Sequence, residues 1–411
     1  MNSQHSSAGS AAVPLFDLQR QHTALRDEIR AAVMQVCDST RFIFGPECQQ
    51  LEEQVASYSQ ARYGVACASG SDALLLALMA CDIGPGDDVL VPSYTFFATA
   101  SAVWRLGARP VFVDIDPDTY NIDPQCVAAA VTPRAKAIIP VHLFGQCADM
   151  DAILAAGRNY GLTVIEDAAQ AIGAEYQGRR AGSMGHMSCF SFYPTKNLGG
   201  AGDGGMLTTN DEILAAKLRL LRGHGMEPRY YHQVVGINSR LDSLQAAVLN
   251  VKLPHLDAWT ELRAGNARRY EQLFTAHGLE RFLSLPTVAP ARRHVWNQYV
   301  VRVAGGKRDA LRKHLTDRKI GTEIYYPLPL HQQACFASLQ ATTGPLPETE
   351  RAARETLALP IFPELQSVEQ DAVVVAIADF FGAARPAGGH SIPRPKHLAP
   401  SPVRQNHPER R

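Results

Sequence analysis

The strongest candidate for a chemical role in this sequence is a lysine beside a glycine-rich loop. Lys196 follows the apolar segment Met187 to Ser191 and precedes five glycines within residues 199–205. Glycine lets a backbone pass close to a bound group, so an amine here can clamp a phosphate or form a Schiff base with a carbonyl compound. The pattern of a nucleotide-binding P-loop is absent. An ordinary solvated lysine beside a flexible loop is the alternative.

Two further groups stand where ligands commonly bind. Asp167 ends the apolar segment Thr163 to Asp167, and ligands bind at the carboxyl ends of strands in open parallel sheets. Gly70, Ser71 and Asp72 open a helical pattern, and the free N–H groups at a helix start favour an anion. Taken singly, Asp167 can equally be a surface residue, and Ser71 or Asp72 a helix cap.

These residues need a framework, and residues 60–210 alternate short apolar segments with longer helical patterns. The predicted strands are Asp88 to Pro92, Pro110 to Asp114, Ala137 to His142, Thr163 to Asp167, Met187 to Ser191 and Gly205 to Thr209. The predicted helices are Ser71 to Ala80, Thr95 to Leu106, Met150 to Tyr160 and Glu212 to Arg222. Such alternation is typical of an α/β protein with a mostly parallel sheet covered by helices on both faces.

The rest of the chain has a different pattern. A helical stretch meets Pro254 and resumes beyond it, which predicts a kinked helix connecting two domains. Residues 298–382 alternate strand and helix patterns, with a short strand at Thr322 to Tyr325, and predict a small α+β domain. We expect a flexible N-terminus at 1–12, a large domain at 13–255, a small domain at 256–382 and a disordered Pro-rich tail at 383–411.

The composition argues against several classes of protein. Forty Lys and Arg balance 40 Asp and Glu, whereas a nucleic-acid surface needs an excess of positive charge. The apolar run Ala73 to Cys81 is far shorter than the roughly 20 residues that span a bilayer. The eight cysteines are too widely spaced for a structural zinc site and favour a reducing cytoplasm. We expect no metal, no nucleic acid and no membrane among the partners.

Three motifs resemble one known family. TVIEDAAQAIGA, SFYPTKNLGGAGDGG and GINSRLDSLQAAVL match, in order and spacing, the DegT/DnrJ/EryC1/StrS family of pyridoxal 5'-phosphate-dependent sugar aminotransferases. SGSDALLLAL, VPSYTFFATASAV, PVFVDID and IGTEIYYPLPLH support the resemblance, which covers about residues 13–382. It implies the fold-type-I architecture, with a mostly parallel, seven-stranded type of sheet in the large domain and a smaller C-terminal α+β domain.

The resemblance gives the candidate residues roles around that cofactor. Lys196 would hold it as a Schiff base and carry the proton between the substrate carbon and the cofactor. Asp167 would face the pyridine nitrogen and keep it protonated, so that the ring accepts an electron pair. Ala169 would lie against the ring face and Gln170 near the phenolic oxygen.

The same resemblance assigns the phosphate and ring contacts. Gly70, Ser71 and Asp72, with the hydroxyl of Ser191, would bind the phosphate. Phe96 would stack on the pyridine ring, and its neighbour Phe97 is the rival for that place.

Contacts with a second chain and with the substrate are implied as well. Asn238 would reach the phosphate of a neighbouring subunit, which implies a homodimer with shared active sites. Arg240, Tyr325 and His331 resemble positions near the substrate. For His142 a hydrogen-bonded core position is the preferred interpretation.

The implied reaction moves an amino group, with L-glutamate as the expected donor, to a keto group of a nucleotide-linked sugar. The block IGTEIYYPLPLH favours a 3-keto hexose. Products of this kind serve polysaccharide, O-antigen or secondary-metabolite biosynthesis. One alternative is a dehydratase of the same family, although dehydratases replace the lysine by histidine. Another is a non-catalytic regulatory protein, although no separate DNA-binding pattern is present.

Overall fold

The computed structural model describes residues 12–383, apart from the side chains of residues 341 and 342. The predicted flexible N-terminus (1–12) and Pro-rich tail (383–411) fall almost wholly outside this part. Within it, no helix is long and apolar enough to cross a membrane, and no group of His, Cys, Asp or Glu side chains could hold a metal ion.

A seven-stranded sheet forms the centre of the molecule, with its strands in the order β1-β9-β8-β5-β4-β2-β3. Strand β9 is antiparallel to β1 and β8, and the other neighbouring strands are parallel. The strands are β1 (Tyr63–Cys67), β2 (Asp88–Pro92), β3 (Arg109–Val113), β4 (Ala135–Ile138), β5 (Thr163–Asp167), β8 (Met187–Ser191) and β9 (Gly205–Thr209). The predicted mostly parallel sheet is confirmed, and β1 is an additional edge strand.

Helices cover both faces of this sheet because its strands are apolar on both sides. Val89 and Val91 belong to a core formed with α3, α4 and α7, whereas Leu90 between them belongs to a core formed with α2, α5, α6 and α8. These helices are α2 (Pro46–Tyr58), α3 (Gly70–Ala80), α4 (Ala98–Arg105), α5 (Pro124–Ala130), α6 (Met150–Tyr160), α7 (Glu212–Leu221) and α8 (Ser243–Lys252).

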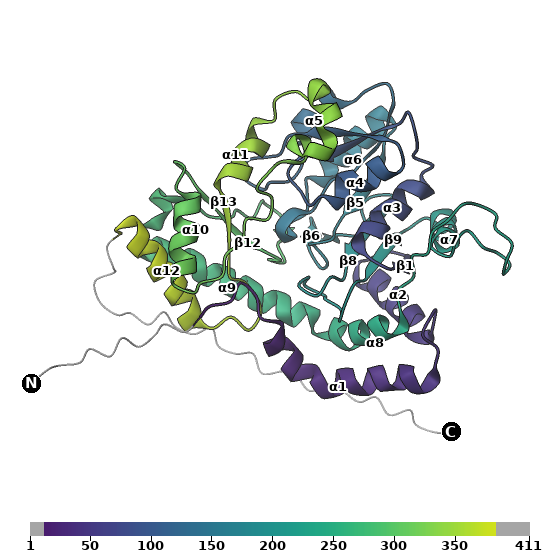
Figure 1. Cartoon of the computed structure of the whole chain (residues 1–411), viewed down its shortest axis with the longest axis horizontal. Coiled ribbons are helices and arrows are strands. Elements are labelled where there is room, and N and C mark those ends of the chain that lie inside the picture. The colour runs from purple at the N-terminus through teal and green to yellow at the C-terminus, as the bar shows by residue number, and fades with distance from the viewer. Residues whose placement is uncertain (1–11, 384–411) are drawn as a thin grey trace, which may run out of the picture.

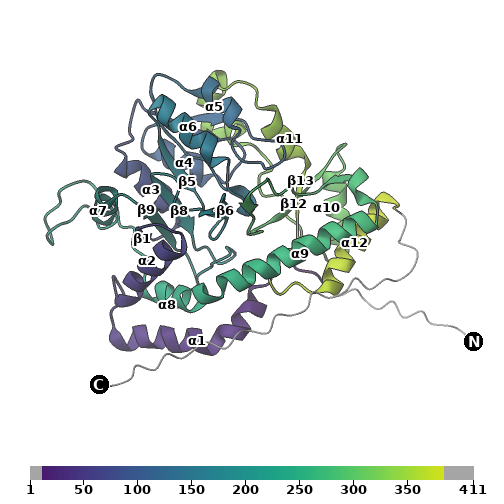
Figure 2. The ribbon, with the colours of Figure 1, turned by 180° about the vertical axis from the view of Figure 1, so that it is seen from behind.

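A long helical path leads from the sheet to the C-terminal part of the chain. Helix α8 passes through the 3-10 turn η2 (Leu253–His255) into α9 (Leu256–Ala276), so the kink predicted at Pro254 is present. In both views α9 runs diagonally across the molecule, and α1 (Leu18–Ser39) lies alongside α8 (Figures 1 and 2).

The C-terminal part has its own sheet and apolar core. The strands β10 (Leu283–Ser284), β12 (Tyr299–Val303) and β13 (Thr356–Leu359) form an antiparallel sheet. Helices α9, α10 (Arg308–Asp317) and α12 (Ser367–Phe381) pack on it through a core that includes Tyr270, Leu311 and Val373. The remaining elements are β6 (Glu175–Tyr176), β7 (Arg179–Arg180), β11 (Arg292–Arg293), α11 (Pro347–Glu355) and the 3-10 helices η1 (Leu143–Gly145), η3 (Leu279–Arg281), η4 (Leu330–Gln332) and η5 (Ala334–Thr342).

Three predicted elements were wrong in extent or type. The strand predicted at 322–325 is only an isolated bridge between Glu323 and Ala358, on the edge of β13 that β12 leaves free, and the pairing does not extend beyond it. The strand predicted from 137 to 142 ends at Ile138, shortly before Pro140, which has no N–H for the ladder. The helix predicted from Thr95 begins only at Ala98.

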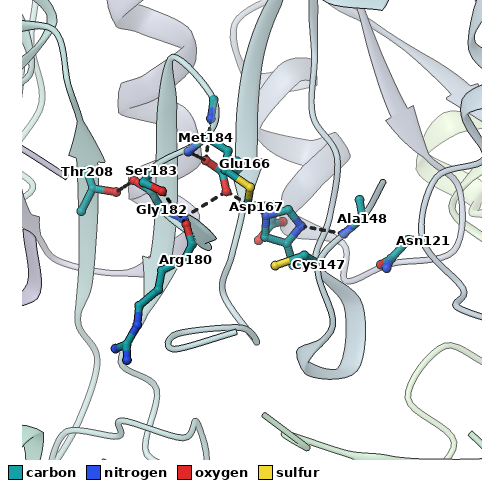
Figure 3. A network of polar contacts seen from close by, with 12 residues as sticks. Asn121, Cys147, Ala148, Glu166, Asp167, Arg180, Gly182, Ser183, Met184 and Thr208 are labelled. Atoms are coloured by element: carbon teal, nitrogen blue, oxygen red, sulfur yellow. Dashed lines mark hydrogen bonds and ion pairs between the residues drawn. The ribbon is translucent and has the colours of Figure 1, made fainter. Parts of the chain in front are cut away.

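Strand β5 is fixed to its neighbours by a fully buried carboxylate (Figure 3). Glu166 accepts hydrogen bonds from His142 Nε2 at 2.9 Å and from the backbone N–H groups of Gly182, Met184 and Gly185 at 2.7–3.0 Å. Burial pushes the pKa of Glu166 up, but these hydrogen bonds more than offset burial and leave it below the ordinary value of 4.5. Glu166 therefore belongs to the framework behind the site.

We predict that Glu166→Gln lowers the free energy of unfolding by about 3 kcal/mol at pH 7. The amide oxygen can still accept, but the amide NH2 faces backbone N–H donors. The folded-state pKa is depressed, so the stabilisation by the wild-type carboxylate is present above pH 4.5 and is lost as the pH falls through the folded-state value.

Urea unfolding at pH 7 and at pH 3.5 measures the difference in free energy of unfolding between the wild type and Glu166→Gln, and this difference should be smaller at pH 3.5. Glu261→Gln is the control, since Glu261 forms an exposed ion pair with Arg293 and should contribute under about 1 kcal/mol. An equal loss in both variants would contradict the assigned role of Glu166.

Candidate functional site

One cavity of about 550 Å³ brings most of the candidate residues together, at the carboxyl ends of the parallel strands. Residues from the C-terminal part of the chain complete its wall. The candidates that line it are Gly70, Ser71, Phe96, Asp167, Ala169, Gln170, Ser191, Lys196 and Tyr325. Asp72, Asn238, Arg240 and His331 are not part of its lining.

Lys196 stands in a tight turn after β8. Its backbone N–H donates to the carbonyl of Tyr193 at 2.8 Å, and Lys252 Nζ donates to the carbonyl of Gly199 at 2.5 Å on the following loop. A side chain at Gly199 would collide with the backbone of Pro194, so only glycine lets this loop fold back. Burial lowers the pKa of Lys196 to about 8, against an opposing effect of Asp167. The amine therefore loses its proton more readily than an ordinary lysine and is suited to attack a carbonyl group.

Asp167 is a buried carboxylate without a charged hydrogen-bond partner among the described residues. Its Oδ2 accepts from Thr99 Oγ1 at 2.8 Å, and its Oδ1 accepts from the backbone N–H of Ala169 at 3.2 Å. Burial raises its pKa, although the Thr99 and Ala169 hydrogen bonds and the charge of Lys196 oppose this rise. A cationic group bound in the cavity would meet this carboxylate and keep it ionised.

The start of α3 offers donors to an anion. Ser69 is the N-cap, and its hydroxyl accepts from the N–H of Asp72 at 3.1 Å. The cap is therefore Ser69, not Ser71 or Asp72, and the N–H groups of Gly70 and Ser71 point out of the helix start. A Cβ at Gly70 would lie 2.7 Å from Ser191 Cβ, so glycine is required for β8 to approach this helix end.

These three groups fit pyridoxal 5'-phosphate. The helix start with Ser191 suits a phosphate, Lys196 suits an aldehyde, and Asp167 suits a protonated pyridine nitrogen. The cofactor unites these three chemistries in one small molecule, and one cavity joins the corresponding residues.

The two neighbouring phenylalanines have different positions. Phe96 is 60% exposed and lines the cavity, whereas the ring of Phe97 packs 5.7 Å from that of Phe336. Gln170 is held on the cavity wall, because its oxygen accepts from the N–H of Phe144 at 2.7 Å and its NH2 donates to the Tyr326 hydroxyl at 2.9 Å. Phe96 is thus the aromatic ring available to a bound cofactor.

The candidates outside the cavity have other contacts. His142 is buried beside Glu166, and His331 lies 2.7 Å from the hydroxyl of Ser93. The carboxylate of Asp72 accepts from Ser239 Oγ at 2.8 Å. Asn238 is exposed, and Arg240 is partly buried, near the end of the segment between α7 and α8 that projects from the body (Figures 1 and 2).

Several residues in or directly behind the cavity wall had no place in the sequence-based prediction. Thr99, which bonds to Asp167, lies one helical turn beyond Phe96 in a block that was noted only for its resemblance. Arg263, Asn297 and Gln298 line the cavity from the C-terminal part. Arg263 is in a long amphipathic helix in which nothing in the sequence distinguishes it from the other arginines.

Comparison with known proteins agrees with this geometry. The sequence model of the DegT/DnrJ/EryC1/StrS aminotransferase family matches residues 23–378. A protein of Geobacillus stearothermophilus named pleiotropic regulatory protein is 52% identical, over 90% of this chain and 98% of the relative. A UDP-N-acetyl-3-dehydro-alpha-D-glucosamine 3-aminotransferase of Acidithiobacillus ferrooxidans is 46% identical, over 90% and 97%. The crystal structure of DesV from S. venezuelae in complex with a ketimine intermediate superposes with a TM-score of 0.86 at 43% identity, covering 90% of this chain and 99% of that one.

We predict that Thr99→Val weakens the binding of pyridoxal 5'-phosphate about 10-fold. Valine keeps the shape of threonine but removes a hydrogen bond to a carboxylate, which contributes roughly 1.5 to 3 kcal/mol. The pKa of Asp167 should rise further, and its attraction for a protonated ring nitrogen should weaken.

Titration of the apo protein with the cofactor, followed by absorbance, measures this affinity. Ser101→Ala is the control, because the Ser101 hydroxyl bonds only within its own helix. Unchanged cofactor affinity in a correctly folded Thr99→Val variant would refute the positioning role.

Proposed function

We propose that this chain, which belongs to the DegT/DnrJ/EryC1/StrS aminotransferase family, moves an amino group from L-glutamate to a 3-keto group of a nucleotide-linked hexose. It is a pyridoxal 5'-phosphate-dependent sugar aminotransferase. The observation that carries the proposal is the joint presence of Lys196 and Asp167 on one cavity wall, with the start of α3 beside them.

The residues of the chain divide the reaction among them. The cofactor, when bound, supplies a carbonyl for the exchange of amino groups and a ring that takes up an electron pair. Lys196 Nζ would hold the cofactor through its carbonyl carbon until the amine of the substrate takes its place, and the freed amine would then carry the proton to and from the substrate carbon. Asp167 would hold the proton on the ring nitrogen, and Thr99 orients the Asp167 carboxylate. Gly70, Ser71 and Ser191 would hold the phosphate, and Phe96 would lie against the ring.

The choice of sugar rests on sequence. The relative from A. ferrooxidans is named for a 3-dehydro sugar, and it matches nearly the whole chain. The block IGTEIYYPLPLH includes Tyr325, which lines the cavity, and resembles members that act on 3-keto sugars. We propose Tyr325, His331 and Arg240 as substrate contacts, with Arg240 facing the substrate pocket of a second chain.

The exposure of the segment between α7 and α8 supports the proposal of a homodimer with shared sites. Tyr230, Tyr231 and Val235 are 73%, 71% and 90% exposed on it, close to Asn238. Such an apolar surface suits contact with a second copy of the chain, and Asn238 of one copy would then reach the phosphate bound by the other. The eight unpaired cysteines favour a cytoplasmic location.

Two other functions are disfavoured by Lys196. A dehydratase of this family has histidine in its place. A purely regulatory function is raised by the name of the G. stearothermophilus relative, but such a function has no need of a lysine with a lowered pKa opposite a buried carboxylate.

We predict that Lys196→Ala abolishes amino transfer while the fold persists. Wild-type protein incubated with glutamate and a UDP- or dTDP-linked 3-keto hexose should yield an amino sugar detectable by mass spectrometry, and the variant should yield none. Wild-type protein should also absorb in the near-visible when loaded with cofactor. Retained turnover in the variant would contradict the role of Lys196, and the absence of an amino sugar with every 3-keto or 4-keto acceptor tested would contradict the proposed reaction.

We further predict that mixing two inactive variants restores activity. One variant carries Lys196→Ala, and the other carries both Asn238→Ala and Arg240→Ala. If Asn238 and Arg240 serve the neighbouring subunit, a heterodimer of the two variants has one intact site and one site with all three substitutions. Native mass spectrometry checks that heterodimers form. No recovered activity in a mixture that contains them would mean that Asn238 and Arg240 act within their own chain.

A further inference from the structure

A group of buried polar side chains lines the cavity opposite the large sheet and has no role in the scheme above. It consists of Arg263 on α9 and of Asn297 and Gln298 just before β12, and it lies beside the proposed substrate contact Tyr325. Arg263 is 7% exposed, and Asn297 and Gln298 are each 8% exposed. All four belong to the same cavity as Lys196.

Arg263 is a buried cation without an anionic partner among the described residues. Its Nη1 donates to the carbonyls of Trp296 at 3.1 Å and Ile361 at 3.0 Å. These two carbonyls fix the guanidinium, and its other N–H groups have no hydrogen bond within this part of the chain. Burial lowers its pKa to about 10, and the more distant Glu364 opposes that effect. A buried charge of this kind is costly unless an anion meets it.

Each of the two amides beside it has one atom without a partner among the described residues. The side-chain oxygens of Asn297 and Gln298 are buried and accept no hydrogen bond from any described residue. An amide that turns by half a circle presents its NH2 group in place of its oxygen, so each can donate to a ligand. Gln298 also contacts the hydroxyl of Tyr325. One buried cation beside two amides that can turn their NH2 groups toward a ligand matches a carboxylate.

We propose that Arg263, with Asn297 and Gln298, binds a carboxylate of the amino donor. The proposal rests on the proposed function, because an aminotransferase must admit its donor and its acceptor in turn to one lysine. An amino acid always carries a carboxylate, and a short dicarboxylate fits a group that is 93% buried better than the bulky diphosphate of a nucleotide does. A carboxylate on the sugar itself is the other source of the same chemistry, and the experiment separates the two.

The direct test measures binding of glutarate, a dicarboxylate that has no amino or keto group and cannot react. Calorimetry on the cofactor-loaded protein should give a dissociation constant that is about 10 to 100 times weaker in Arg263→Gln than in the wild type. Arg268→Gln is the matched control, since Arg268 is exposed on the same helix and should bind glutarate normally. Arg263→Lys, which keeps the charge, should lie between.

Kinetics separates the two sources of the carboxylate. In Arg263→Gln the KM for glutamate should rise, and the KM for the nucleotide sugar should not. Unchanged glutarate affinity in a folded variant with a normal cofactor spectrum would overturn the proposal, and so would a loss confined to the sugar. If Arg263→Gln does not fold, Asn297→Leu decides, and a severalfold weaker binding of glutarate is expected.

These outcomes are independent of the acceptor sugar. Glutarate binding that depends on Arg263 would support the carboxylate site even if no nucleotide sugar were aminated, in which case only the proposed acceptor would fail. Amination of a sugar with glutarate binding unaffected by Arg263→Gln would leave the proposed function intact and remove this inference.

Discussion

Two successive acids end strand β5, and burial forces each of them to find partners. Because neighbouring strand residues face opposite sides, Glu166 and Asp167 meet different surroundings. Glu166 receives four hydrogen bonds from the chain itself, so its charge is satisfied before any ligand binds. Asp167 receives two, from Thr99 and Ala169, and no cation. The chain itself therefore provides four hydrogen-bond donors to Glu166, whereas Asp167 can still accept a cationic group of a bound cofactor.

This difference explains the arrangement around the strand end. The bonds to Glu166 fix the backbone of residues 182–185 next to β5, and those residues lead into β8 and so to Lys196. The backbone N–H of His142 donates to the carbonyl of Asp167 at 2.9 Å, which holds the same strand end from the other side. The position of Lys196 relative to Asp167 therefore depends on a network that never touches the substrate.

The sequence-based prediction succeeded where the signal is local. Strands β5, β8 and β9 and helix α6 have the predicted bounds to the residue, since each is a continuous local pattern. The capping alternative named Ser71 or Asp72, whereas the N-cap of α3 is Ser69, whose hydroxyl accepts from the N–H of Asp72 three residues later. The bond from Thr99 to Asp167 spans 68 positions, and the contacts of Arg263 span 33 and 98. No local pattern encodes such pairs, and only the resemblance identified the cavity before the structure did.

The cavity places an easily deprotonated amine, Lys196, and a permanent cation, Arg263, on different walls. Lys196 must lose a proton easily, and burial lowers its pKa, but Asp167 nearby limits that effect. A second cation close to Lys196 would lower its pKa further and would also compete for Asp167. Arg263 stands instead on the wall formed by α9 and the start of β12, anchored to two carbonyls of the C-terminal part. The positive charge that we propose for a substrate anion is thus in the C-terminal part, and the acid that we propose for the cofactor is in the sheet. The sheet alone could bind the cofactor, but the polar wall that faces a substrate comes from the C-terminal part, so the reaction requires both.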